Sequence, residues 1–383
     1  MKQLNFLIKP SSSLCNMQCR YCFYADISDK RMVKSYGLMS VETAECLISS
    51  AFSAIDPGGE ITFAFQGGEP TLVGLSFYKT FIKLEKKHEK PGVTVHHMIQ
   101  TNGYSINEDW AAFFFKHNFL VGLSIDGTRA IHNLYRIDSF GSGTWKNAAN
   151  SLQLLQKNHV DVNLLCVVTK QCARNPQKVY HTLKKLGAGY LQFIPCLDPL
   201  DIPRGEDAFS LTPEAYSNFL CGLFDAWYLD WKVGQYTSIR LFDDYVHILM
   251  RQPSSSCTTS VQCGHYLVVE GDGGLYPCDF YVLDNWFLGN IRDVDLAQID
   301  QCKLVQDFLE ESRHHPNDCK SCQWYFVCCG GCKRDWYMQN GIQKNYYCSS
   351  FQKFFAYYHS RLHEIVVAEF NAIHSTAYRD LHS

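Results

Sequence analysis

Three cysteines near the start of the chain have a spacing suited to cluster chemistry. The stretch "SSSLCNMQCRYCFY" places Cys15, Cys19 and Cys22 within eight positions. Three thiolates can hold a four-iron cluster and leave one iron open, and an open position distinguishes a catalytic metal site from a structural one. The alternative is a buried stripe on a helix, because positions i, i+4 and i+7 share one helical face. Pro10 and the serines after it favour a loop.

Cysteines gather again in the last third of the chain. They are Cys257, Cys263, Cys278, Cys319, Cys322, Cys328, Cys332 and Cys348. Paired C-x2-C spacings are also typical of structural zinc, so from these residues alone zinc sites and iron–sulfur clusters both remain open. The run "VCCGGC" offers both Cys328 and Cys329, and only the spacing to the neighbouring cysteines favours Cys328. With no export signal, eighteen cysteines indicate metal or redox chemistry rather than disulfides.

Two further features could serve a reaction. The segment "QGGEP" pairs Gly67 with Gly68, and paired glycines allow a backbone to approach a ligand closely. It lacks the Gly-Lys-Ser/Thr ending of a phosphate loop. Asp279 directly follows Cys278, so a carboxylate stands beside a candidate metal ligand. It could act as a general base, or it could merely cap a turn in "PCDFY".

The elements that must position these residues are strands and helices in alternation. Six β-rich runs occur at 4–10, 61–66, 93–100, 120–126, 160–168 and 190–197. Stretches of helical character lie between them, for example after Ser40 and after Asn107. This order predicts an α/β fold with a parallel sheet, a partial (β/α)6 TIM-like barrel, with a doubly wound sheet as the alternative. The cysteine and glycine motifs would then lie at the C-terminal ends of strands.

The alternation stops near residue 235, which predicts two domains, 1–235 and 236–383. The second is rich in cysteine, and 351–383 has apolar residues at helical spacing that predict a closing helix. The formal net charge is −3, without a long run of one sign that would indicate a nucleic acid or a membrane surface as partner. No membrane span or signal peptide is evident, so we expect a cytoplasmic protein. No coiled-coil seam argues for a dimer, so we expect a monomer.

The front motif resembles the radical S-adenosylmethionine (SAM) superfamily, with an aromatic residue before the last cysteine and "FY" after it. In that resemblance SAM occupies the open iron of a [4Fe–4S] cluster bound by the three front cysteines. The segment Gly67, Gly68 and Glu69 resembles the superfamily's GGE segment, which implies contacts to the methionyl amino group. The same resemblance implies a set of further cofactor contacts, at Tyr24, Gln66, Ser124 and Asp126. Asp126 precedes a glycine, so a plain turn explains it equally well.

The second set of cysteines resembles the SPASM extension found in radical enzymes that act on peptides. The resemblance implies two auxiliary [4Fe–4S] clusters with interleaved ligands, three clusters in all. One set is Cys257, Cys263, Cys278 and Cys332; the other is Cys319, Cys322, Cys328 and Cys348. Four thiolates saturate a cluster, so neither auxiliary site would bind substrate directly.

Over nearly its full length the chain most resembles the anaerobic sulfatase-maturating enzymes. The stretches that carry this resemblance are "LIKPSSSLCNMQCRYCFY", "FAFQGGEPTL", "LQFIPCLDPL", "YPCDFYVLD" and "NYYCSSF". It implies that a 5'-deoxyadenosyl radical removes a Cβ hydrogen from a cysteine or serine of a sulfatase, yielding Cα-formylglycine. Asp279 would be the general base, and the auxiliary clusters would accept an electron. The implied partners are a sulfatase segment, Cys/Ser-x-Pro/Ala-x-Arg, and an electron donor such as flavodoxin or ferredoxin.

Two other functions compete with this interpretation. A radical enzyme that installs crosslinks or thioethers, or that epimerises residues, in a ribosomally made peptide often carries a leader-binding domain. Cys15 lies so close to Met1 that we expect no room for one. A non-catalytic electron carrier or zinc-stabilised binding module would have no use for a three-cysteine loop beside a Gly-Gly-Glu segment. The sequence does not decide between cysteine and serine as the target residue.

Overall fold

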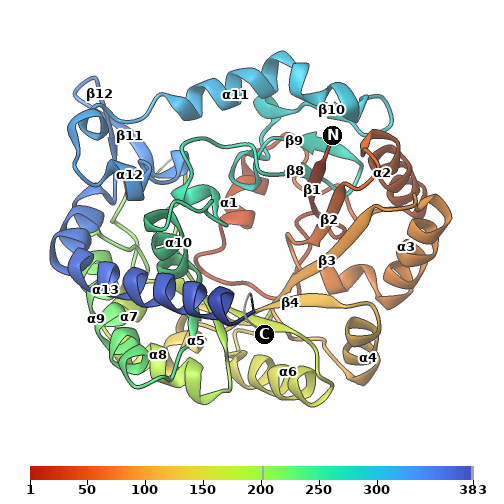
Figure 1. Ribbon diagram of the computed structural model, residues 1–383. Coiled ribbons are helices and arrows are strands. Elements are labelled where there is room, and N and C mark those ends of the chain that lie inside the picture. The colour runs from red at the N-terminus through yellow and green to blue at the C-terminus, as the bar shows by residue number, and fades with distance from the viewer. Residues whose placement is uncertain (201, 381–383) are drawn as a thin grey trace.

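A parallel sheet forms the frame of the molecule, and a computed structural model describes residues 1–200 and 202–380 of it (Figure 1). The six predicted strands are β1 (Gln3–Ile8), β2 (Glu60–Phe65), β3 (Thr94–Thr101), β4 (Phe119–Ser124), β5 (Val162–Val168) and β6 (Tyr190–Pro195). They pair side by side in chain order, and every pair is parallel. Sequential order with helices on the outside is barrel topology, so the predicted partial barrel is confirmed and the doubly wound alternative is wrong.

Helices cover the outer face of this sheet. Those of the barrel are α2 (Val41–Ala54), α3 (Leu75–His88), α4 (Glu108–Lys116), α5 (Arg129–Tyr135), α6 (Trp145–Lys157), α7 (Lys170–Ala173), α8 (Pro176–Lys185) and α9 (Pro213–Lys232). Two start where the sequence indicated. Ser40 caps α2 by accepting a hydrogen bond from the backbone N–H of Thr43, and Asn107 caps α4 in the same way.

Alternation along the strands separates the outer face from the interior of the barrel. In β2, Ile61, Phe63 and Phe65 are fully buried, while the two residues between them are half-buried. Phe63 and Phe65 pack edge to face on Phe81 of α3. The main hydrophobic core of this part of the chain therefore lies between the sheet and the helices.

Later parts of the chain extend both edges of the six-stranded sheet. β1 pairs in parallel with β8 (Leu267–Val269), which continues antiparallel into β9 (Gly274–Tyr276) and β10 (Gly289–Asn290). At the other edge, β6 pairs with β7 (Ser238–Ile239). Four strands that the sequence did not predict thus complete a sheet of ten. The division into 1–235 and 236–383 stays a prediction, since the sheet runs across it.

The cysteine-rich part of the chain lies against the open side of the barrel. Its elements are α10 (Arg240–Leu249), α11 (Lys303–Arg313), α12 (Tyr325–Cys328) and the hairpin of β11 (Trp336–Gln339) and β12 (Ile342–Asn345). Short 3₁₀ turns connect them, including η3 (Asp279–Tyr281) and η4 (Asp284–Trp286).

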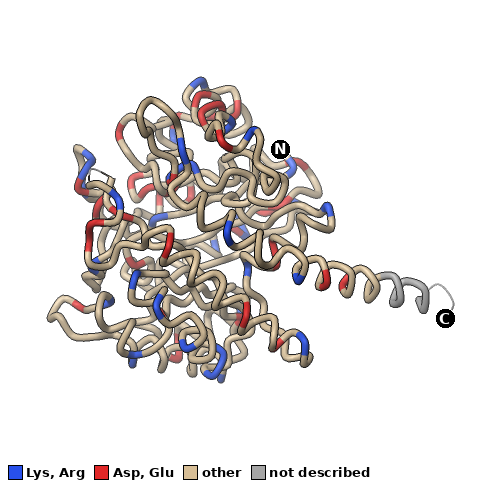
Figure 2. The backbone as a smooth tube through the Cα atoms, turned by 90° about the vertical axis from the view of Figure 1, so that its left-hand side faces the viewer, with Lys and Arg blue, Asp and Glu red and all other residues tan. Residues whose placement is uncertain are grey.

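A long helix closes the chain. The predicted helix is confirmed as α13 (Cys348–Asp380), which packs on α9 and α10; residues 381–383 of that prediction lie outside the described part. Beyond this packing, α13 extends away from the body of the molecule (Figure 2). Basic and acidic residues are interspersed along the backbone in the same view. Within residues 1–200 and 202–380, no helix combines the length and hydrophobicity needed to span a membrane.

Candidate active site

The three front cysteines lie on a loop at the C-terminal end of β1. Residues 11–13 form a turn, with Ser12 in the left-handed region at φ 51°. A short helix, α1 (Phe23–Asp29), begins only after Cys22, so the helical-stripe alternative is wrong. The three thiols also act on one another electrostatically, which places them around one common region.

Their environment fits a positively charged cluster. Burial raises the pKa of the Cys15 thiol to about 12 and that of Cys19 to about 11. Such thiols become thiolates when iron supplies positive charge, because metal binding releases the proton. Two hydrogen-bond donors lie near Cys15: the N–H of Met17, on the same loop, lies 3.4 Å from its sulfur, and the amide nitrogen of Asn102, after β3, lies 3.7 Å away. These donors favour the charged form of the thiol.

The glycine pair lies directly against the cysteine loop. Gly67 and Gly68 follow β2 with φ values of 97° and 55°, conformations that favour glycine. A Cβ atom on Gly68 would lie 2.2 Å from the carbonyl oxygen of Leu14, and one on Gly67 would lie 2.6 Å from Cε of Lys9. Glycine is therefore needed for the two loops to meet. The implied contacts of these residues to SAM stay predictions.

Glu69 joins the ends of two neighbouring strands. Its fully buried carboxylate accepts hydrogen bonds from the N–H and hydroxyl of Thr71, from the hydroxyl of Thr101 and from the N–H of Asn102, at 2.6 to 3.1 Å. Its own N–H donates to Leu14 O at 2.8 Å. Burial raises the pKa of this carboxyl, and the four donors oppose that shift. The geometry shows a residue that fixes three loops, whereas the implied contact to SAM remains untested.

Asp126 and Ser124 lie at the end of β4, both buried. The carboxylate of Asp126 accepts from the hydroxyl of Tyr21 and from the N–H of Val167 at 3.0 Å. The buried Arg136 donates to the same Tyr21 hydroxyl at 3.0 Å. Asp126 therefore anchors the cysteine loop to the barrel through Tyr21. The sequence noted Tyr21 only as the aromatic residue before the last cysteine, without a role, and it did not single out Arg136, because a lone arginine carries no distinctive pattern.

Asp279, Tyr24 and Gln66 come together, although the sequence separates them widely. The Tyr24 hydroxyl donates to Oδ2 of Asp279 at 2.6 Å, and the Gln66 amide nitrogen lies 2.5 Å from that hydroxyl and 3.3 Å from the same Oδ2. The other oxygen, Oδ1, is buried and has no hydrogen-bond partner among the described residues. Burial raises the pKa of Asp279 to about 6, against the opposing influence of Lys9 and Tyr24. One oxygen is thus held in place and the other is available.

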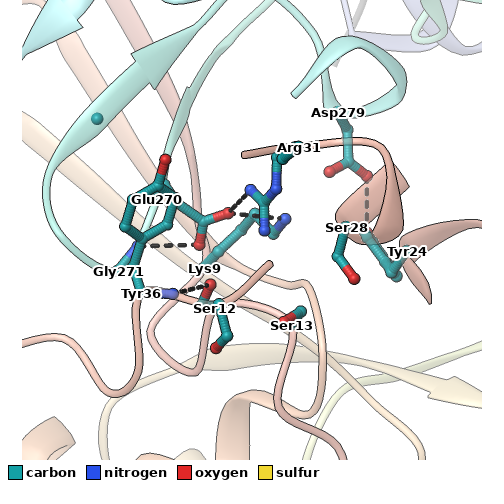
Figure 3. Close-up of polar contacts among 12 residues, drawn as sticks. Lys9, Ser12, Ser13, Tyr24, Ser28, Arg31, Tyr36, Glu270, Gly271 and Asp279 are labelled. Atoms are coloured by element: carbon teal, nitrogen blue, oxygen red, sulfur yellow. Dashed lines mark hydrogen bonds and ion pairs between the residues drawn. The ribbon is translucent and has the colours of Figure 1, made fainter. Parts of the chain in front are cut away.

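A buried ion cluster lies beside Asp279 and Tyr24 (Figure 3). Lys9, at the end of β1, pairs with Glu270 at 3.1 Å, and Arg31 pairs with the same carboxylate at 2.5 Å. The Lys9 ammonium also lies 5.3 Å from the ring centre of Tyr24. Burial would raise the pKa of Glu270, but the two cations hold it below its usual value. The cluster links β1 to the β8–β9 turn, and no sequence signal indicated it.

Eight of the other cysteines line two separate cavities, in the two groups of four that the resemblance implied. The first auxiliary cavity is lined by Cys257, Cys263, Cys278 and Cys332; the second by Cys319, Cys322, Cys328 and Cys348. Cys328 faces the second cavity, while the buried Cys329 is not among its lining residues. No three His, Cys, Asp or Glu side chains in the described part converge on a point that one metal ion could occupy. Thiols spread around a cavity suit a multinuclear cluster.

Comparisons with known proteins agree with this geometry. The radical SAM superfamily model matches residues 10–182, and the iron–sulfur cluster-binding domain model (SPASM) matches residues 257–323, which favours iron–sulfur clusters over zinc in the second half. A cysteine-type anaerobic sulfatase-maturating enzyme of Clostridium novyi is 43% identical, covering 93% of this chain and 95% of that protein. A serine-type enzyme of Klebsiella aerogenes is 32% identical, covering 92% and 84%.

A solved structure has nearly the same fold. Native anSMEcpe with bound AdoMet and the Kp18Cys peptide superimposes with a TM-score of 0.91 at 42% identity, covering 96% of this chain and 99% of that one. Identity at this level over nearly the whole of each chain goes beyond a shared fold. The chain therefore belongs to the anaerobic sulfatase-maturating enzymes of the radical SAM superfamily.

Proposed function

We propose that this protein oxidises a cysteine side chain of a target sulfatase to Cα-formylglycine. The choice of cysteine over serine is supported by identities of 43% to a cysteine-type and 32% to a serine-type enzyme. It is also supported by the likeness to anSMEcpe with a bound Kp18Cys peptide. The target segment would be Cys-x-Pro/Ala-x-Arg in an extended, unfolded state.

The observation that carries this proposal is the meeting of Asp279 with Tyr24 and Gln66. Asp279 follows the cavity-lining Cys278, and Tyr24 follows the cysteine loop, so the carboxylate stands between the two regions of cluster chemistry. Its Oδ2 is fixed by two donors and its Oδ1 is available to accept a proton. A carboxylate held in this way is suited to act as a general base toward a substrate heteroatom.

Different residues of the chain would bind the cluster, admit SAM and accept the proton. When bound, the front [4Fe–4S] cluster and SAM supply the 5'-deoxyadenosyl radical that removes a Cβ hydrogen from the substrate. Cys15, Cys19 and Cys22 hold that cluster, and the Gly67–Gly68 turn admits SAM beside it. Asp279 takes the thiol proton. Loss of that proton, and of one electron that an auxiliary cluster would accept, would leave a thioaldehyde, which water would convert to the aldehyde with release of hydrogen sulfide.

The proposal also covers the electron donor, the cellular location, the oligomeric state and the auxiliary clusters of the enzyme. A low-potential electron donor such as flavodoxin or ferredoxin would supply the reducing electron in the cytoplasm, and the enzyme would act as a monomer with a boundary between its domains near residue 235. Each auxiliary cavity would hold one [4Fe–4S] cluster. Four thiols around each cavity support this assignment.

The test is an anaerobic product assay. The iron-reconstituted protein is incubated with dithionite, SAM and a peptide carrying Cys-x-Pro-x-Arg, and the peptide is analysed by mass spectrometry. We expect the mass to fall by the difference between a CH2SH and a CHO group. The matched serine peptide should react more slowly. Formation of 5'-deoxyadenosine with an unchanged peptide would contradict sulfatase maturation and favour another peptide substrate.

A further inference from the structure

Lys333 lies in a cage of three aromatic rings, next to the cavity-lining Cys332. Its ammonium nitrogen is 4.1 Å from the ring centre of Phe308, 4.9 Å from that of Trp286 and 5.1 Å from that of Tyr281. The three rings also pack edge to face on one another, so the cage is built by η3, η4 and α11 together. Only 11% of the Lys333 side chain is exposed. A cation held against aromatic faces and shielded from water acts strongly on its surroundings.

The cage adjoins the first auxiliary cavity. Lys333 and Tyr281 line that cavity together with the four cysteines. Burial raises the pKa of the Cys263 thiol, and the charge of Lys333 acts against that shift. The partner of Lys333 is Glu311, whose carboxylate lies 2.6 Å from the ammonium. Glu311 is 55% exposed, so water screens its negative charge more than it screens the enclosed cation.

The two auxiliary cavities differ in their electrostatics. In the first, the Arg334 N–H donates to the sulfur of Cys332 at 3.4 Å, and the Tyr266 hydroxyl lies 3.8 Å from the sulfur of Cys278. The second is lined by a carboxylate, Asp318. Asp318 helps to raise the pKa of the Cys348 thiol and the charge of Lys344 lowers it, but Lys344 is not among the residues that line that cavity. Asp279 and Asp335 also act on Cys278 and Cys332 of the first cavity, and the Gly330 N–H favours the thiolate of Cys328 in the second. Among the side chains that line the two cavities, however, the first has the cation Lys333 and no carboxylate, whereas the second has the carboxylate Asp318 and no cation.

We propose that Lys333 raises the reduction potential of the first auxiliary cluster and makes it the better electron acceptor of the two. Reduction adds one negative charge to a cluster, and a fixed cation beside it stabilises the reduced form. This inference rests on the proposed function, in which the substrate radical must lose an electron. One electron passes from the substrate carbon to this cluster, the thiol proton passes to Asp279, and a carbon–sulfur double bond forms. Asp279 and the cluster ligand Cys278 are neighbours in the chain, so both acceptors stand on one segment.

The test measures potentials without any peptide. In a background that carries Cys15→Ala, Cys19→Ala and Cys22→Ala, only the auxiliary clusters give an electron paramagnetic resonance signal. Potentiometric titration of the reconstituted protein then yields the midpoint of each. We expect Lys333→Met to lower one midpoint and leave the other unchanged, and Lys333→Arg to shift it much less. Lys303→Met serves as the control, because Lys303 is an exposed cation on the same helix as Glu311 and should shift neither midpoint.

A second variant keeps the test decisive if Lys333→Met does not assemble its clusters. Glu311→Gln removes an exposed carboxylate and should leave the fold intact, and we expect it to raise the midpoint that Lys333 controls. An unchanged midpoint in fully loaded Lys333→Met would overturn the proposal. So would a downward shift, or no shift, in Glu311→Gln.

The same variants separate this inference from the proposed function. With the front cysteines restored, Lys333→Met should still produce 5'-deoxyadenosine but yield less formylglycine for each molecule of it. If the midpoint shifts as expected while the wild-type protein makes no formylglycine, the proposed function fails and the role of Lys333 stands.

Discussion

At Asp279 the two carboxylate oxygens have different surroundings, and this difference can be tested by one substitution. Asp279→Asn keeps the shape of the side chain but removes its ability to take a proton. We expect formylglycine formation to fall by about 10²–10⁴-fold, the usual contribution of a positioned base. Formation of 5'-deoxyadenosine should continue, because the front cysteines are untouched. Asp293→Asn, an exposed carboxylate nearby in the sequence, is the control, and equal product yields from the two variants would remove Asp279 from the mechanism.

The sequence predicted individual residues best where spacing constrains them. Spacing singled out the cysteines, and the family resemblance singled out the Gly-Gly-Glu segment; the structure brings the two loops together, and their roles toward a cluster and SAM stay predictions. The ion pairs of Glu270 with Lys9 and Arg31 could not be found, because the partners lie more than two hundred positions apart and look like ordinary surface charges. The sequence singled out Glu69 but did not indicate its hydrogen bonds with Thr101 and Asn102, because these residues lie at the end of the next strand.

At the level of elements, the contact between the glycine turn and the cysteine loop can be tested with matched glycines. Gly68→Ala adds a Cβ atom 2.2 Å from the carbonyl oxygen of Leu14, at φ 55°. Gly58→Ala adds one at φ 75° with nothing within 4 Å. The left-handed backbone conformation alone should lower the free energy of unfolding by about 1–2 kcal/mol in either variant. We expect only Gly68→Ala to weaken SAM binding in addition, as measured by equilibrium dialysis of the reconstituted protein. Equal affinities would show that the contact does not shape the SAM site.

At the end of the short helix α12, only one of two adjacent cysteines lines the second auxiliary cavity. Cys328 lines the second auxiliary cavity, and Cys329, in the left-handed region at φ 53°, is buried. We expect Cys328→Ala to lose about the iron and sulfide of one [4Fe–4S] cluster, because three thiolates hold an auxiliary cluster less firmly than four. Cys329→Ala should keep its full content. Iron and acid-labile sulfide analysis of the two purified proteins checks this, and the opposite pattern would assign the ligand to Cys329.

The elements of the barrel were predictable and those that complete it were not. The six barrel strands carry strong β patterns, and the predicted ranges agree with them to within a few residues. β7 to β10 are only two or three residues long, too short for a periodic pattern to show. Their place is set by tertiary pairing, as in the bonding of β8 to the free edge of β1.

On the scale of the whole molecule, that pairing joins the cysteine-rich half to the barrel, and the Glu270 cluster lies at the junction. Lys9 follows β1, Arg31 follows α1, and Glu270 follows β8, so three segments meet in one buried group of charges. The Lys9 ammonium of this group faces the ring of Tyr24, whose hydroxyl donates to the candidate base Asp279. Stability at the junction and geometry at the active site are therefore coupled.

Glu270→Gln tests this junction, and its effect should depend on pH. The substitution leaves two buried cations without their carboxylate, which should cost about 3–5 kcal/mol of unfolding free energy. The pKa of Glu270 is lower in the folded protein than in the unfolded chain, so the stability it adds is present above the ordinary glutamate pKa and is lost as pH falls through the folded-state pKa. Denaturant unfolding of both proteins should therefore show the largest difference near neutral pH and a shrinking one below about pH 4.3. A difference that stays constant across this range would mean that the charge of Glu270 does not hold the two halves together.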